Sequence, residues 1–181
     1  MNVVKCDLQD VLILEPKVFG DERGLFYESY NERDFATETD IKTRFVQDNH
    51  SRSAKNVLRG LHYQIKQPQG KLIRVTAGEV FDVAVDIRRS SPTFGKWTTA
   101  RLSGENRRML WVPPGFAHGF LVISDSAEVL YKTTEYWAAQ YERCIVWNDP
   151  DLNVPWPLDG EPTLSQKDRA GLPLKEAELF P

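Results

Sequence analysis

The segment "LRGLHYQ" (residues 58–64) places a histidine and an arginine among apolar residues that look like part of a strand. The chain has only three histidines, so the position of His62 is informative. An imidazole with its usual pKa of about 6.5 exchanges protons near neutrality, which is the work of a general base. A lone histidine in a strand is more often structural, so the interpretation depends on what other segments bring to the same place.

Three polar residues outside this segment favour a shared interior. His118 enters a strand directly after the turn "PPG". Lys71 begins the next strand, which we expect to form a hairpin with the segment of His62, and Tyr131 lies in the middle of "EVLYKTTEY". A barrel closes its strands around one interior, where burying polar side chains without a use would cost free energy. The sequence therefore indicates a polar site inside a β-structure.

Strand alternation poses a problem for this site. Side chains two residues apart share one face of a strand, so Arg59 and His62 should point to opposite faces. For both to point inward, Gly60 must break the alternation as a bulge, or Arg59 must precede the regular strand.

A metal site is an open alternative. Metal-binding barrels often carry a second histidine two residues after the first, and that position here is Gln64. Only a site built from distant histidines, namely His50, His62 and His118, remains compatible with the sequence.

Cationic, amide and hydroxyl side chains also occur where a phosphate could be bound. Each one alone is ordinary surface, but together they would supply the forked and point-charge donors that phosphates need. The candidates in this group are Arg23, Gln47, Asn49, Ser51, Ser53, Arg59, Lys71 and Lys167.

Short strands must position these residues. Phe81, Val83, Val85 and Ile87 alternate with more polar or smaller residues, which predicts a strand over 80–87 with one strongly apolar face. The segments "RRMLWVPP", "GFLVIS" and "EVLYKTTEYW" have the same character, and turn signals separate them. Many short strands at this spacing predict an all-β sandwich or barrel of antiparallel strands.

Helical patterns are confined to the edges of the chain. We expect a short helix over 31–39 with Asn31 as its cap, and another in "LPLKEAELF" (172–180). Residues 147–162 are rich in Pro and Asp but carry two tryptophans, which predicts an ordered loop that covers the core.

Composition limits the classes of function. A chain of 181 residues is most simply one domain, 1–181, and a net charge of −3 favours neither a nucleic-acid polymer nor an anionic membrane as partner. No apolar run has the length of a signal peptide core or a membrane span. Cys6 and Cys144 lie far apart without metal-site spacing, so we expect free thiols in a reducing cytoplasm.

Four long segments resemble one known family, the dTDP-4-dehydrorhamnose 3,5-epimerases. They are "FVQDNHSRSAKNVLRGLHYQ", "GKLIRVTAGEVFDVAVDIRRSSPTFGKW", "VPPGFAHGFLVISDSAEVLYKTTEYW" and "LSQKD", and the likeness runs from about residue 3 to about residue 173. The resemblance implies a cupin-type jelly roll with a few short peripheral helices, a homodimer, and no metal or organic cofactor. It also implies inversion of C3 and C5 of dTDP-4-dehydro-6-deoxy-D-glucose on the way to dTDP-L-rhamnose, a precursor of cell-surface polysaccharides.

The resemblance further implies a role for each site residue. His62 matches the base, Asp168 the carboxylate that orients it, Lys71 the cation near the developing oxyanion, and Tyr131 the acid on the opposite ring face. The positions that match substrate contacts are Arg23, Phe26, Glu28, Gln47, Asp48, Asn49, Arg59, His118, Trp137, Glu142 and Lys167. The chain departs from the family after "EYW", where it reads "WAAQYER" without the expected proline.

Three other functions remain open at this point. A relative acting at C3 or C5 alone would use the same base and acid. A metal-dependent cupin enzyme would need the distant histidines to converge. A catalytically silent sugar-nucleotide-binding protein would leave His62, Lys71, Tyr131 and Asp168 without a purpose.

Overall fold

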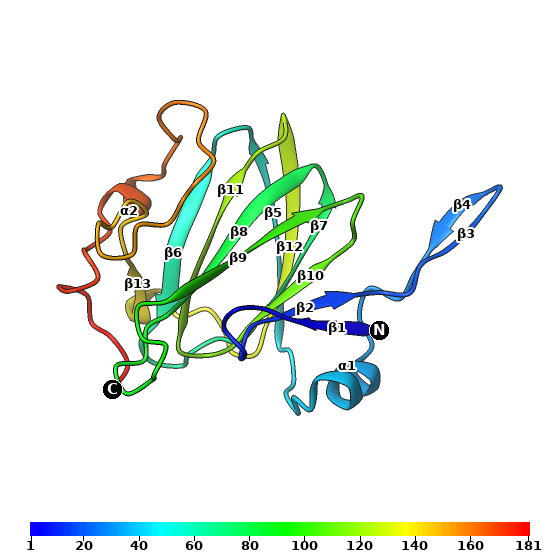
Figure 1. Ribbon diagram of the computed structural model, residues 1–181, viewed down its shortest axis with the longest axis horizontal. Coiled ribbons are helices and arrows are strands. Elements are labelled where there is room, and N and C mark those ends of the chain that lie inside the picture. The colour runs from blue at the N-terminus through cyan, green and yellow to red at the C-terminus, as the bar shows by residue number, and fades with distance from the viewer.

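Two antiparallel sheets face each other in the computed structural model, which describes residues 1–181 (Figure 1). One sheet has the strand order β1-β2-β10-β7-β12-β5, and the other has the order β13-β6-β11-β8-β9. The first sheet consists of β1 (Asn2–Lys5), β2 (Leu12–Glu15), β10 (Met109–Val112), β7 (Lys71–Ala77), β12 (Ser126–Thr133) and β5 (Gln47–Ala54). The second consists of β13 (Glu142–Cys144), β6 (Leu58–Gln64), β11 (Phe116–Val122), β8 (Glu79–Asp86) and β9 (Trp97–Ser103). The predicted all-β class is confirmed.

The helices are short and peripheral, as predicted. Helix α1 (Glu32–Thr39) begins at Asn31, whose side chain accepts hydrogen bonds from the backbone N–H groups of Arg33 and Asp34. The other two are a 3₁₀ turn, η1 (Ala139–Tyr141), and α2 (Gln166–Arg169). None of these helices has the length and apolarity that crossing a bilayer requires.

The helix predicted over 172–180 is wrong. This segment makes a single turn, in which the backbone N–H of Ala177 bonds the carbonyl of Pro173. Its two ends are held extended by bridges, from Leu172 to Ile145 and from Phe180 to Arg88. The chain is therefore stretched along the second sheet, with no room for further helical turns.

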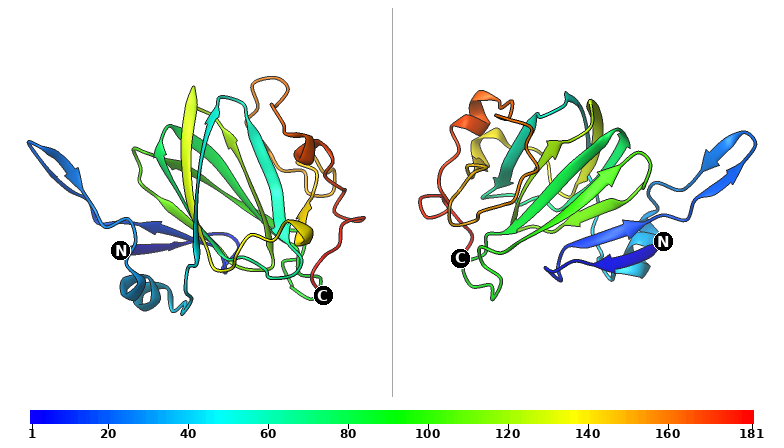
Figure 2. Two further views of the ribbon diagram at one scale, coloured as in Figure 1. Left: turned by 180° about the vertical axis from the view of Figure 1, so that it is seen from behind. Right: turned by 45° about the horizontal axis from the view of Figure 1, so that its top comes forward.

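Strand β8 is buried on both faces, whereas the alternation predicts one apolar face. Val80 and Ala84 belong to the core between the two sheets. Val83 and Val85 lie on the other face, under the C-terminal cover (residues 147–180), which contributes Trp156 to the cluster there. The outer face of this sheet is thus a second core. Figure 2 shows the C-terminal segment, coloured orange to red, running along the outside of the molecule.

Strands β6 and β7 do not form the predicted hairpin, because they belong to different sheets. The connection between them crosses from one sheet to the other. As a result, Lys71 at the start of β7 lies across the sandwich from His62 in β6, and its Nζ donates to the carbonyl oxygen of His62 at 3.4 Å.

Gly60 interrupts the alternation of β6, as expected. His62 pairs with His118 and Arg59 pairs with Phe120, so two residues of β6 oppose one residue of β11 between these pairs. Gly60 has a φ of 123°, a conformation that disfavours a side chain. The bulge turns Arg59 and His62 toward the same side of the sheet, where both line one cavity.

The hairpin formed by β3 (Phe19–Asp21) and β4 (Gly24–Phe26) projects away from the body in every view (Figures 1 and 2). Its apolar side chains have no cover: Phe19, Leu25 and Phe26 are 54%, 51% and 68% exposed. An unsupported apolar hairpin of this kind is typical of an arm that packs on another molecule.

Replacing Gly60 with alanine should destabilise the fold strongly. The added Cβ would lie 2.6 Å from Cα of Gly119 and 2.8 Å from the carbonyl oxygen of His118, and these backbone atoms cannot move aside. We expect Gly60→Ala to lower the free energy of unfolding by about 3 kcal/mol or more, measured by urea denaturation.

Gly160→Ala is the matched control. Gly160 also has a positive φ, of 76°, but no atom lies within 4 Å of the added Cβ. This variant should lose only about 1–2 kcal/mol, the usual cost of a left-handed backbone angle. Equal losses in the two variants would mean that the backbone angle alone, and not the approach of β11, requires glycine at position 60.

Candidate active site

A polar cavity of about 320 Å³ opens between the two sheets. Ten residues of the predicted site line it: Gln47, Asn49, Arg59, His62, Lys71, His118, Tyr131, Trp137, Glu142 and Lys167. Of the three further lining residues, Ser51 belongs to the group predicted to bind an anion, whereas Gln69 and Phe120 were not predicted. Ser51 continues the alternation of Gln47 and Asn49 along β5.

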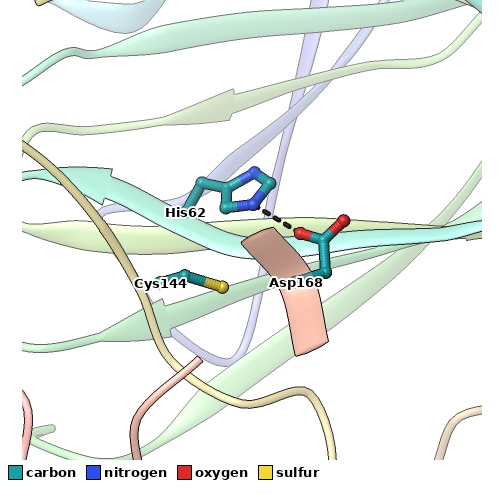
Figure 3. A group of neighbouring side chains, drawn as sticks. All are labelled: His62, Cys144 and Asp168. Carbon is teal, nitrogen blue, oxygen red and sulfur yellow. Dashed lines mark ion pairs between the residues drawn. The ribbon is translucent and has the colours of Figure 1, made fainter. Parts of the chain in front are cut away.

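His62 and Asp168 form the closest polar contact of the site (Figure 3). Nε2 of His62 lies 2.6 Å from Oδ1 of Asp168, whose side chain is only 3% exposed. The same oxygen accepts a hydrogen bond from the backbone N–H of Gly60 at 3.1 Å. Burial opposes ionisation of Asp168, but the contacts with His62 and Ser165 prevail and lower its pKa to about 2. The carboxylate is therefore ionised at neutral pH.

Helix α2 holds Asp168 in place through a capping box. The Oγ of Ser165 accepts from the backbone N–H of Asp168 and donates to its Oδ2 at 2.6 Å. The motif Ser-x-x-Asp is a recognised start signal for a helix, so this four-residue helix could have been found in "LSQKD".

Burial tunes the other ionisable groups toward proton transfer. It lowers the pKa of His62 below its usual 6.5, although Asp168 opposes the shift, so the imidazole is neutral and can accept a proton. Burial also lowers the pKa of Lys71 to about 8. Tyr131 responds in the opposite direction, because burial raises the pKa of its phenol and so retains the proton.

A second histidine and carboxylate pair was not predicted. His118 lies opposite His62 in the ladder between β11 and β6, and its Nε2 is 2.8 Å from Oδ1 of Asp82. Asp82 is completely buried. The alternation along β8 predicts that Asp82 lies on the less apolar face of the strand. In the structure that face points into the interior of the sandwich.

The lining residues come from opposite sheets. His62 and His118 lie on the second sheet, whereas Lys71 and Tyr131 lie on the first. A flat ligand held between the sheets would present one face to His62 and the other to Tyr131.

Gln64 positions the loop that carries Trp137. The side chain of Gln64 is buried, donates to the carbonyl of Tyr136 and accepts from the backbone N–H of Ala138. The backbone N–H of Trp137 itself donates to Oε1 of Gln47. The loop is thus tied to both sheets even though it lacks the expected proline.

Four of the predicted substrate-contacting residues do not reach this cavity. Arg23 and Phe26 lie on the projecting hairpin, and Glu28 is exposed at its base. Asp48 lies between Gln47 and Asn49 on β5, so the alternation turns it to the outer face, where it pairs with Lys132 at 3.0 Å.

The distant three-histidine metal site does not form. His50 points to the outer face of β5 and contacts Glu128 at 3.1 Å, so it cannot join His62 and His118. A different group does bring metal-ligand atoms together, because His62, Cys144 and Asp168 place them within 4.8 Å of one another (Figure 3).

Comparison with known proteins is consistent across sequence and structure. The family model described as dTDP-4-dehydrorhamnose 3,5-epimerase matches residues 5–176. A protein of that name from Pseudomonas aeruginosa is 60% identical over 181 residues, which cover 100% of both chains.

Solved structures agree with this match. The chain superposes with a TM-score of 0.97 on the dTDP-6-deoxy-D-glucose-3,5-epimerase of Legionella pneumophila in complex with dTDP-4-keto-L-rhamnose, at 51% identity and with 99% and 97% of the two chains covered. A 3′-monoepimerase from Streptomyces bikiniensis in complex with dTDP-quinovose gives a TM-score of 0.89 at 30% identity, covering 94% and 87%. The jelly-roll fold expected from the resemblance is confirmed, and the chain belongs to the dTDP-4-dehydrorhamnose 3,5-epimerase family.

Proposed function

We propose that the protein epimerises C3 and C5 of dTDP-4-dehydro-6-deoxy-D-glucose, the step that leads to dTDP-L-rhamnose. One observation carries the proposal: a neutral imidazole and a protonated phenol line one cavity from opposite sheets. Inversion of a carbon needs a base on one face of the ring and an acid on the other. The family match supplies the substrate.

The ketone at C4 activates both neighbouring C–H bonds. His62 removes the proton from C3 or C5, and because Nε2 faces Asp168, the nitrogen available for this proton is Nδ1. The resulting enolate carries its negative charge on the C4 oxygen, where Lys71 and His118 stabilise it. Tyr131 then returns a proton from the opposite face. One base and one acid serve both carbons because the ketone lies between them.

The mouth of the cavity suits the nucleotide diphosphate. Arg59 and Lys167 supply cationic donors there, and Gln47 and Asn49 supply amides from β5. The ring of Trp137 is largely exposed and available to stack on the thymine or the sugar. Each proton transfer and each charge has a side chain of this chain assigned to it, so the mechanism calls for no cofactor.

The working form is a homodimer in this proposal. Arg23, Phe26 and Glu28 match nucleotide contacts but lie on or beside the projecting hairpin, outside the chain's own cavity. A second protomer that received this hairpin would cover its exposed phenylalanines and complete its own site. Cys6 and Cys144 are both free, which fits a reducing compartment, and we assign the enzyme to the cytoplasm.

A second candidate is epimerisation at a single carbon. The similarity to a 3′-monoepimerase supports it, because the fold alone does not separate the two activities. Incubation with the 4-keto sugar nucleotide in D₂O, followed by proton NMR, distinguishes them. We expect exchange at both C3 and C5, and exchange at C3 alone would identify the protein as a monoepimerase.

Two variants test the assigned roles in the same experiment. His62→Ala should lose exchange at both carbons by about 10²–10⁴-fold, the usual contribution of a general base. Tyr131→Phe should retain more exchange than product formation, because the base still works but the opposite face lacks its proton. An equal loss of exchange and product in Tyr131→Phe would remove Tyr131 from the role of acid.

The pH profile of kcat/KM should be bell-shaped. Activity should rise with pH through a value below 6.5, where His62 becomes neutral, and fall as pH passes about 8, where Lys71 loses its charge. Lys71→Arg keeps the charge at any accessible pH and should remove the alkaline limb. An alkaline limb unchanged in this variant would show that another group causes it.

A mixed dimer tests whether the hairpin acts on the partner. One protomer carries His62→Ala and the other carries Arg23→Ala with Phe26→Ala, and two affinity tags allow the heterodimer to be purified. If the hairpin completes the partner's cavity, one of the two sites is intact, and we expect about half of the wild-type activity. A heterodimer as inactive as its two parents would show that the hairpin serves its own protomer.

A further inference from the structure

Cys144 lies directly beside the pair formed by His62 and Asp168. Strand β13 pairs with the edge of β6 so that Cys144 is the register partner of His62. In Figure 3 the thiol and the imidazole come from these neighbouring strands, and the carboxylate comes from α2. A ring nitrogen of His62, Sγ of Cys144 and a carboxylate oxygen of Asp168 all lie within 4.8 Å of one another.

The proposed epimerisation makes no use of this thiol. Cys144 is not among the residues that line the substrate cavity. It instead lines a second hollow of about 230 Å³, together with Ala170, Leu172 and Glu178, and this hollow shares Glu142 and Lys167 with the substrate cavity. An ion can therefore approach Cys144 from a hollow next to the one that the substrate would fill.

The three ligand types are those that zinc prefers. Zinc binds thiolate sulfur, imidazole nitrogen and carboxylate oxygen at about 2.3, 2.0 and 2.1 Å, which for a tetrahedral ion places the ligand atoms about 3.4–3.6 Å apart. The contact of His62 with Asp168 is 2.6 Å, and the three atoms span at most 4.8 Å. Shifts of about 1 Å would thus bring all three to coordination distance.

Nε2 of His62 is a buried atom without a satisfied hydrogen bond. It lies close to Oδ1 of Asp168, but the direction of the contact does not meet the geometry of a hydrogen bond. Nε2 therefore has a charged neighbour at contact distance but no well-directed hydrogen bond. An ion placed between the nitrogen and the carboxylate would satisfy both.

The charges balance when the thiol is ionised. A divalent cation meets one thiolate, from Cys144, and one carboxylate, from Asp168. The S–H bond of Cys144 breaks and its proton passes to solvent. The proton on Nε2 of His62 moves to Nδ1, three metal–ligand bonds form, and no electron is transferred. The nearby cations Lys71 and Lys167 repel a metal ion. The metal can therefore bind only if its ligands neutralise its two charges.

We propose that His62, Cys144 and Asp168 form an inhibitory site for a thiophilic divalent cation such as Zn²⁺ or Cd²⁺. Coordination at Nε2 leaves the proton of the neutral imidazole on Nδ1 and separates the ring from the carboxylate, so Nδ1 can no longer act as a base. The inhibition rests on the proposed role of His62, whereas the binding does not, and the two are measured separately.

The binding is tested by titrating metal-free protein with Cd²⁺ and recording the ultraviolet thiolate-to-cadmium charge-transfer absorbance. The chain has only two cysteines, so Cys6→Ser is the matched control. Wild type and Cys6→Ser should bind one Cd²⁺ per chain with the absorbance band. Cys144→Ser should lose the band and about 10²-fold or more in affinity, since removing even an outer-shell partner typically costs 10–100-fold. A band that persists in Cys144→Ser, or disappears in Cys6→Ser, would overturn the site.

The inhibition is tested with Zn²⁺ in the epimerisation assay. Metal-free Cys144→Ser should be as active as wild type, and it should need about 10²-fold more Zn²⁺ for half inhibition, by the same loss of a ligand. A chelator should restore the wild-type rate. Cadmium binding through Cys144 with no effect of Zn²⁺ on the rate would refute the inhibition, and activity of His62→Ala would then decide whether the base is misassigned.

Discussion

The site depends on the contacts that the carboxylate of Asp168 makes. Its Oδ1 meets both the imidazole of His62 and the backbone N–H of Gly60, while its Oδ2 is held by Ser165. This one carboxylate contacts the bulge of β6, the imidazole of His62 and helix α2. Burying a carboxylate costs free energy unless hydrogen bonds and charges compensate it. The bulge, His62 and α2 must therefore all be in place for Asp168 to be buried.

The two sheets define the chemistry because each contributes a different kind of group. The second sheet holds the imidazoles in pairs with carboxylates, and the first sheet holds the lysine and the phenol. Burial shifts the pKa of His62 and Lys71 down and that of Tyr131 up. The same low-dielectric interior therefore favours a neutral imidazole at His62, an ammonium group at Lys71 that deprotonates more readily than usual, and a phenol at Tyr131 that keeps its proton, as the proposed roles of base, cation and acid require.

Local patterns predicted much of this, and long-range pairing explains the rest. The alternation of apolar residues identified the strands. Arg59 and His62 would point to opposite faces of a regular strand, and this conflict predicted the break at Gly60, where the structure has a bulge. Alternation could not tell which sheet a strand joins, so the expected hairpin of β6 and β7 was wrong. It also could not foresee that the C-terminal cover buries the outer face of β8.

The site residues divide in the same way. Residues from the family motifs converge where their side chains face the interior. Asp48 was predicted only because it lies between Gln47 and Asn49, and the alternation of the strand turns its side chain outward. Asp82 was missed because its contact with His118 depends on the register between β8 and β11, which local sequence patterns do not reveal. Cys144 was dismissed for lack of a spacing motif, because the ladder of β13 with β6 brings it to His62 across a long stretch of sequence.

The position of α2 near the C-terminus governs the order in which the chain acquires its activity. The hydrogen bond from Gly60 to Asp168 spans 108 residues, so this loop closes only after nearly the whole chain has been synthesised. A nascent chain in which both sheets have already emerged still holds His62 without its carboxylate. In the mechanism proposed above, catalytic competence therefore comes only when α2 docks.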